Sequence, residues 1–151
     1  MEILENRKEY LEDFIRLNEE WISAYFEIEE IDRDLAANPE MVINNGGFIF
    51  SLVENGIVIG VCALFHKGNG TYELARMAVS PKHQGNGYGS RLLDAAMAKA
   101  KDIKAKKVFL VSNTKLKNAI ALYKKYGFVT VFEGQHPVYK RANITMEYPD
   151  L

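Results

Sequence analysis

The strongest constraint on the fold of this chain is a change of hydrophobic period close to Pro81. Before it, residues 46–79 contain three segments rich in β-branched and aromatic residues, and Asn55-Gly56 between the first two is a strong two-residue hairpin signal. After it, five apolar residues recur at the spacing of one helix face: Leu92, Leu93, Ala96, Met97 and Ala100. The sequence therefore predicts an antiparallel meander followed by an amphipathic helix.

The segments on either side complete a mixed order. Helical spacing over residues 9–38 predicts two helices, and residues 106–113 read as a buried strand. A second amphipathic helix is expected over residues 115–126, with strands following at 128–134 and 142–148. We expect an α+β protein of order ααβββαβαββ, with an optional strand before the first helix and a mostly antiparallel central sheet flanked by helices.

Length and composition predict one water-soluble domain, residues 1–151. No apolar run approaches the ~20 residues of a membrane-spanning helix, so we expect no membrane partner. The acidic N-terminus lacks the features of a secretory signal, which favours a cytoplasmic location. Cys62, the only cysteine, is interpreted as a small core residue, and the three scattered histidines predict no metal site.

Charge is divided unevenly along the chain, although the net charge is only -1. Residues 1–40 carry 4 basic and 13 acidic side chains, whereas residues 81–125 carry 11 basic and 2 acidic ones. Solvated helix faces that pair across the surface are the ordinary explanation.

Three glycines, Gly85, Gly87 and Gly89, join the third strand to the helix that follows. A helix N-terminus leaves about four backbone N–H groups unpaired and carries a partial positive charge. Glycines let an anion approach closely and permit the positive φ angles of an anion-binding nest. The loop therefore indicates a diphosphate site, although glycines also serve tight turns and close helix packing.

Other nucleotide-binding and nucleic-acid-binding sites are not supported. A P-loop needs a lysine before the Ser or Thr that opens the helix, and Gly89-Ser90 follows a tyrosine instead. A dinucleotide site needs its glycines after the first strand of a βαβ unit, whereas antiparallel strands come first here. No helix-turn-helix segment is evident, so we expect no nucleic acid as a partner.

Two motifs resemble those of the GCN5-related N-acetyltransferase (GNAT) family. Gln84-x-x-Gly87-x-Gly89, after a strand that ends at Val79, is similar to the family's acyl-CoA-binding motif. Residues 118–128 are similar to its Asn-x-x-Ala-x-x-Leu-Tyr-x-x-x-Gly-Phe pattern. The order of motifs and elements extends the resemblance over nearly the whole chain. Shorter sequence segments such as ELARMAV and VSNTKL resemble those of a bacterial branch of the family that is sometimes fused to winged-helix regulators.

The resemblance implies acetyl-CoA as the acyl-donor substrate, with direct transfer of its acetyl group to an amine and no metal. The implied cofactor contacts come from the strand main chain, from the glycine loop and from two asparagines, the first of which could instead cap the following helix. They are Met77, Val79, Gln84, Gly85, Asn86, Gly87, Tyr88, Gly89, Asn113 and Asn118.

Two catalytic residues are also implied. An alkyl ammonium with a pKa of ~10.4 is almost fully protonated at pH 7, so an amine nucleophile needs a base. The resemblance indicates Glu73, for which a solvent-facing strand carboxylate is the alternative interpretation. It also indicates Tyr123 as the acid that protonates the departing thiolate, since a tyrosine with a pKa near ~10 keeps its proton at neutral pH. The alternative for Tyr123 is an aromatic core residue.

The acceptor is expected beside a late loop that contains Gln135, His136, Tyr139, Arg141 and Asn143. Tyr139 and Arg141 are the candidate substrate-binding residues, and Arg141 could hold a substrate carboxylate or pair with a surface acid. In the resembled fold the acidic N-terminal helices would flank the acceptor entrance and the basic half would hold the donor, which favours a cationic small-molecule or peptide amine.

Three functions stay open from the sequence. The first is an N-acetyltransferase. The second is a non-catalytic acyl-CoA-binding sensor or partner module, and the third is an acyltransferase that uses another acyl group or an oxygen nucleophile. A monomer and a homodimer are both compatible with the sequence.

Overall fold

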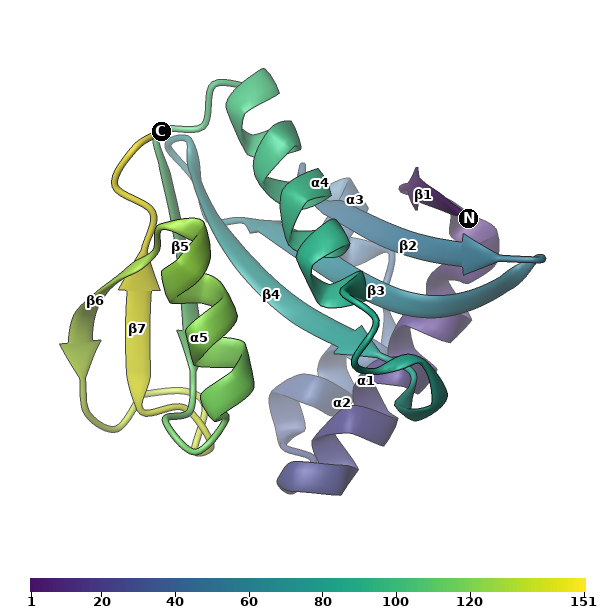
Figure 1. Cartoon of the computed structure of the whole chain (residues 1–151), viewed down its shortest axis with the longest axis horizontal. Helices are drawn as coiled ribbons and strands as arrows, with labels where there is room; N and C mark the ends of the chain where they lie inside the picture. The colour runs from purple at the N-terminus through teal and green to yellow at the C-terminus, as the bar shows by residue number, and fades with distance from the viewer.

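The computed structural model describes residues 1–151 as a seven-stranded sheet with helices on both faces (Figure 1). The strands are β1 (Glu2–Glu5), β2 (Phe48–Glu54), β3 (Ile57–His66), β4 (Thr71–Val79), β5 (Lys107–Ser112), β6 (Val129–Glu133) and β7 (Ile144–Glu147). The helices are η1 (Lys8–Tyr10), α1 (Leu11–Tyr25), α2 (Glu30–Ala37), α3 (Met41–Asn44), η2 (Pro81–His83), α4 (Tyr88–Asp102) and α5 (Lys117–Tyr126). None of the helices has the length and apolar character needed to cross a membrane.

The sheet order β1-β2-β3-β4-β5-β7-β6 confirms the predicted fold class. Every neighbouring pair is antiparallel except β4 and β5. The predicted hairpin turn is present, with positive φ at both Asn55 and Gly56 as its mirror-image turn type requires. The optional first strand exists as β1. Helix α3 and the two 3-10 turns were not predicted, because segments of three or four residues carry too little periodicity.

Two apolar layers hold the helices against the sheet (Figure 1). The predicted face of α4 is fully buried and contributes to a core of 17 residues on one side of the sheet. Helices α1 and α2 cover the other side over a core of 11 residues. Helix α5 lies beside α4, and its apolar residues Ile120, Leu122, Tyr123 and Tyr126 pack against the same core, as predicted, although each is only partly buried.

The central pair of strands, β4 and β5, diverges soon after it begins. Residues Thr71–Glu73 pair with Lys107–Phe109, and the ladder ends there. Beyond Phe109, β5 pairs only with β7. From Leu74 onward, one edge of β4 therefore has no strand partner. Figure 1 shows the two strands parting below their shared upper end. This divergence opens the middle of the sheet.

A β-bulge lies in the diverging part of β4. Val61 pairs with Ala78 and Ala63 with Ala75, so two residues of β4 oppose one residue of β3. The bulged residue is Arg76, whose φ of 60° lies in the left-handed region. A non-glycine residue in that region costs on the order of 1–3 kcal/mol, which the surrounding contacts must offset.

Candidate functional site

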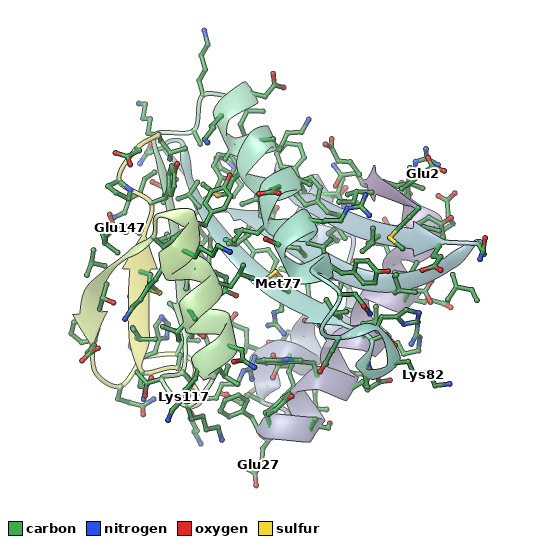
Figure 2. The ribbon with its side chains drawn as sticks, viewed as in Figure 1. Glu2, Glu27, Met77, Lys82, Lys117 and Glu147 are labelled. Atoms are coloured by element: carbon green, nitrogen blue, oxygen red, sulfur yellow. The ribbon has the colours of Figure 1, made fainter.

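A cavity of about 770 Å³ occupies the place where β4 leaves β5. Its walls come from the end of α1, the free edge of β4, the end of β5, the start of α5 and the loop before β7. Figure 2 shows Met77 on β4 in the region between α4 and α5, and Lys117 at the start of α5. The predicted site residues that line the cavity are Glu73, Met77, Val79, Gln84, Gly89, Asn113, Asn118, Tyr123, Tyr139 and Arg141.

The other four predicted residues do not line the cavity: Gly85, Asn86 and Gly87 lie in the turn that leads into α4, and Tyr88 is the first residue of that helix. Gly85 and Gly87 have φ angles of 82° and 78°, and a Cβ on either would meet nothing within 4 Å. Gly87 is the N-cap of α4, and no side chain caps this helix. The first-turn N–H groups are therefore open to an anion, which fits the predicted diphosphate.

Gly89 differs from the other two glycines. It lies inside α4 without a positive φ, and a Cβ there would come 3.6 Å from Leu122 of α5. The expectation of a positive φ at all three glycines is therefore wrong for Gly89, which instead lies against α5.

Side chains of the loop bind its own backbone. Gln84 donates from Nε2 to the carbonyl oxygen of Val79 at 3.2 Å, and Asn86 donates from Nδ2 to the carbonyl of His83 at 3.1 Å. The ring of His83 lies 6.5 Å from that of Tyr88, and its Nδ1 is the one buried side-chain nitrogen or oxygen without a hydrogen-bond partner. The loop is thus braced by its own side chains.

Glu73 is a buried carboxylate, with 5% of its surface exposed, so the interpretation as a solvent-facing strand residue is wrong. Its Oε1 lies 3.8 Å from Nζ of the half-exposed Lys67. Burial raises the pKa of Glu73, while the positive charges of Lys67 and Arg76 act in the opposite direction. A carboxylate with a raised pKa at the wall of a cavity is suited to accept a proton near neutral pH.

Tyr123 lies on α5 and contributes to the cavity wall. Its ring meets Phe128 edge-on at 6.1 Å, so the residue also packs against the core. Burial, with a smaller effect from Cys62, raises the pKa of Tyr123, which keeps the phenol protonated. Cys62 itself is fully buried with a pKa raised to about 12, as expected of a core residue.

Asn113 makes two hydrogen bonds within the protein. Its Nδ2 donates to the carbonyl of Arg141 at 2.8 Å, and its Oδ1 accepts from the N–H of Lys115 at 2.9 Å. Helix α5 begins at Lys117, four residues after Asn113, and has no side-chain cap, so Asn113 closes the preceding turn rather than capping the helix. Asn118 lies in the first turn of α5, at the cavity.

In the late loop, Tyr139 and Arg141 reach the cavity, whereas Gln135, His136 and Asn143 do not. Arg141 forms a two-pronged ion pair with Asp32 of α2, at 2.6 and 2.7 Å, and a further contact of 3.1 Å with Glu29. Both nitrogens of its terminal fork therefore bind acids of the protein. This supports the ion-pair interpretation of Arg141, although its acid partner is buried rather than on the surface.

The sequence reasoning missed Asp32 and Arg76. Asp32 is 3% exposed, and its Oδ1 also accepts from Nη1 of Arg76 at 2.6 Å. Two signals were present in the sequence: Glu29-x-x-Asp32 is an acidic capping pattern at a helix start, and Arg76 interrupts an otherwise apolar strand segment. Neither signal reveals that the two residues meet, because 44 positions separate them.

Aromatic residues at the end of α1 form the outer wall of the cavity. Trp21 lies 5.4 Å from Tyr25 and 6.0 Å from Phe26, measured between ring centroids. Nζ of Lys115 donates to the carbonyl of Tyr25 at 3.0 Å and lies 4.1 Å from the centre of the Phe26 ring. An ammonium group thus already occupies one aromatic face at this wall.

A second hollow of about 870 Å³ lies alongside and shares Tyr25, Phe26, Lys115 and Arg141 with the cavity. Four acidic residues of the α1–α2 region line it, together with four basic ones. The acidic N-terminal segment therefore does border the cavity, but its charges are largely balanced locally. The acids are Glu27, Glu29, Glu30 and Asp34, and the bases are Arg33, Lys115, Lys140 and Arg141.

Comparison with known proteins agrees with this architecture. A family model described as the acetyltransferase (GNAT) family matches residues 9–128. No curated protein matches the chain by sequence.

Three solved structures are similar over nearly the whole chain. A GNAT-family acetyltransferase from Staphylococcus aureus MU50 superposes with a TM-score of 0.85 at 21% identity, covering 97% of this chain and 96% of that one. A ribosomal-protein-alanine N-acetyltransferase from Brucella melitensis gives 0.80 at 16% identity, with 97% and 98% covered. A phosphinothricin acetyltransferase from Sinorhizobium meliloti, in complex with acetyl-CoA, gives 0.77 at 18% identity, with 97% and 86% covered. At these identities the likeness is one of fold.

Proposed function

Because the chain belongs to the GNAT family of acetyltransferases, we propose that it transfers the acetyl group of acetyl-CoA to the nitrogen of an amine. The observation that carries this proposal is the cavity opened by the divergence of β4 from β5, with Glu73 and Tyr123 in its wall. The amine attacks directly, because the only thiol of the chain, Cys62, is buried with a pKa of about 12 and is a poor nucleophile.

The donor half of the site is assigned to the free edge of β4 and the start of α4. Acetyl-CoA supplies an acetyl group already activated as a thioester. Main-chain groups of Met77 and Val79 hold its pantetheine arm, since they lie on the strand edge that no other strand occupies. Backbone N–H groups between residues 84 and 89 bind its diphosphate, and the open, left-handed glycines support this role. The asparagines at 113 and 118 complete this half from the start of α5.

Glu73 acts as the base of the reaction. An ammonium acceptor must lose a proton before its nitrogen can attack, and the Glu73 carboxylate is the only one in the cavity wall. Its burial supports this assignment, because the raised pKa brings it closer to neutral pH than that of an exposed glutamate. Proton transfer occurs directly or through a water molecule.

Tyr123 acts as the acid. Its hydroxyl proton goes to the leaving thiolate, whose release would otherwise be slow. The raised pKa of Tyr123 keeps this proton in place throughout the physiological range, while it also makes the phenol a weaker acid.

We assign the acceptor to cationic amines, either small molecules or exposed peptide amines. Glu73 supplies negative charge, and Asp32 and Glu29 neutralise the nearby arginines. The aromatic wall formed by Trp21, Tyr25 and Phe26 suits an alkyl ammonium through cation–π contact. Faster turnover of acidic or neutral amines than of polyamines or lysine-like amines would contradict this assignment.

The experiment that tests the function is calorimetric titration with acetyl-CoA, followed by thiol release against an amine panel in the same preparation. We expect binding together with thiol release that depends on the amine. Binding without release by any amine would favour the sensor alternative. Release with alcohols or with longer acyl-CoAs instead would favour the third alternative, and absence of binding would contradict the proposal.

A further inference from the structure

The bulge in β4 redirects one side chain across the sheet. Tyr72 and Leu74 face the core under α4, and strict alternation would send residue 76 to the same side. The left-handed φ at Arg76 breaks the alternation, so that Met77 and Val79 take up that face instead. The guanidinium of Arg76 is thereby delivered to the α2 side, where its side chain is only 6% exposed.

Asp32 receives this guanidinium together with a second one. Its carboxylate binds Arg76 at 2.6 Å and Arg141 at 2.6 and 2.7 Å, and it accepts the backbone N–H of Glu29 at 2.8 Å. The Asp32 side chain is 2% exposed, and the residue does not line the cavity. Three segments remote in sequence, α2, the β4 bulge and the loop before β7, therefore meet at one buried carboxylate.

Tyr139 belongs to the same cluster. Nη2 of Arg76 lies 3.4 Å from its hydroxyl, and the guanidiniums of Arg76 and Arg141 lie 5.8 and 5.0 Å from the centre of its ring. Both arginines and Tyr139 line the cavity. Loss of the Asp32 charge would leave two buried guanidiniums with Glu29 as their only carboxylate partner.

We propose that Asp32 is a positioning residue for the acetyl transfer. It holds Arg76 at the β4 bulge and Arg141 in the late loop. In this way it sets the shape of the acceptor half of the cavity and the charge beside Glu73. This inference rests on the proposed function for its kinetic consequences only. The dependence of the Glu73 pKa on the Asp32–Arg76 pair can be measured without turnover.

The charged groups around Glu73 determine in which direction its pKa moves when Asp32 or Arg76 is replaced. Lys67 faces it from the β3–β4 turn, Arg76 from β4 and Tyr139 from the late loop. Beyond them lie His136, which is close to Lys67, and the pair formed by Arg141 and Glu29. Removing the anion at 32 leaves Arg76 uncompensated, which lowers the pKa of Glu73. Removing the cation at 76 has the opposite effect.

The test compares Asp32→Asn, Arg76→Met and the double variant by NMR titration of the Glu73 side-chain carboxyl, with ¹³C-labelled glutamate. We expect the midpoint to move down in Asp32→Asn and up in Arg76→Met, each by about half a pH unit or more, and to return toward the parent value in the double variant. Shifts in the same direction, or no shifts, would overturn the inference, because loosened packing alone does not produce opposed shifts. Should Asp32→Asn fail to fold, the test compares the Glu73 titration midpoints of Arg76→Met and Arg76→Lys. We expect the parent midpoint in the lysine variant and not in the methionine variant.

Kinetics provide the second readout. In Asp32→Asn we expect kcat/KM for the amine to fall at least about tenfold while the Kd for acetyl-CoA changes less than threefold. Asp102→Asn, an exposed aspartate at the end of α4, is the matched control and should match the parent. An equal loss of acetyl-CoA affinity would overturn the assignment to the acceptor half. A parent protein without turnover would contradict the proposed function instead and leave the titration result standing.

Discussion

Nζ of Lys67 lies 3.8 Å from Oε1 of Glu73, so a half-exposed ammonium is the ion-pair partner of a buried carboxylate. The pair is unequal, because Glu73 loses most of its hydration whereas Lys67 keeps much of its own. Burial therefore outweighs the attraction, and the pKa of Glu73 is raised. A site that raises the energy of its own charged base has consequences for both activity and stability.

Glu73→Gln is expected to lower kcat by about 100-fold or more at pH 7, because the amide cannot accept the proton of the ammonium acceptor. The acetyl-CoA affinity should be unchanged, since Glu73 lies on the acceptor side of β4. Thiol release under single-turnover conditions measures the first quantity and calorimetry the second. A variant that retains parent kcat would remove Glu73 from the mechanism.

The same variant should be no less stable than the parent at neutral pH. A raised folded-state pKa means that the stabilising contribution of this carboxyl is fully present below its ordinary value of 4.5 and is lost as pH rises through the raised value. The neutral amide of the variant does not titrate and undergoes no such loss. Denaturant midpoints should therefore favour Glu73→Gln at pH 8, with the gap closing toward pH 4. The reverse trend would show that the native site stabilises the charged form.

Tyr123→Phe is expected to reduce turnover by about 100-fold where the chemical step limits the rate. Folding and acetyl-CoA affinity should be preserved, since the ring keeps its edge-on contact with Phe128. Tyr126→Phe, on the same helix but outside the cavity wall, is the matched control and should turn over normally. Equal rates for the two variants would rule out Tyr123 as the acid.

Gly87→Glu should abolish acetyl-CoA binding in calorimetry, because it puts a negative charge at the N-cap of α4, where the diphosphate is assigned. Gly87→Ala separates charge from backbone strain. A Cβ at 87 meets nothing within 4 Å, and both variants carry the strain of a side chain at a φ of 78°. We expect alanine to weaken binding only a few-fold. Retained binding by the glutamate variant would show that the diphosphate binds elsewhere.

Much of the fold could be predicted because local signals agree with the tertiary structure. The Asn55-Gly56 turn and the buried face of α4 follow from local chemistry and period. Helix α5 follows the same pattern, yet none of its residues is fully buried, because its apolar side chains border the cavity opened by β4 and β5. A hydrophobic period indicates which face turns inward, and not whether the space behind it is filled.

The candidate site also has one part that the sequence predicts and one part that it does not. The glycine loop is contiguous in sequence and carries its own backbone chemistry, so a motif predicts it. The Asp32–Arg76–Arg141 cluster depends on a bulge and on three distant segments, which no local pattern reports. The single domain, the cytoplasmic location, the oligomeric state and the link to the winged-helix-associated branch stay predictions, since the structural neighbours share the fold at 21% identity or less in the three cases compared.

The turn between α3 and β2 supplies a prediction that depends on packing alone. Gly47 is buried, and a Cβ there would lie 2.5 Å from the carbonyl oxygen of Leu64 and 2.8 Å from that of Val42. Both are backbone atoms, so the strand or the turn must move, and Gly47→Ala should cost about 1–3 kcal/mol or more. Gly56→Ala is the control, because its Cβ meets nothing within 4 Å and its positive φ alone should cost about 1 kcal/mol. Urea unfolding measures both values. A cost at position 47 no larger than that at 56 would mean that β2 and β3 are not packed against this turn as closely as the structure has them.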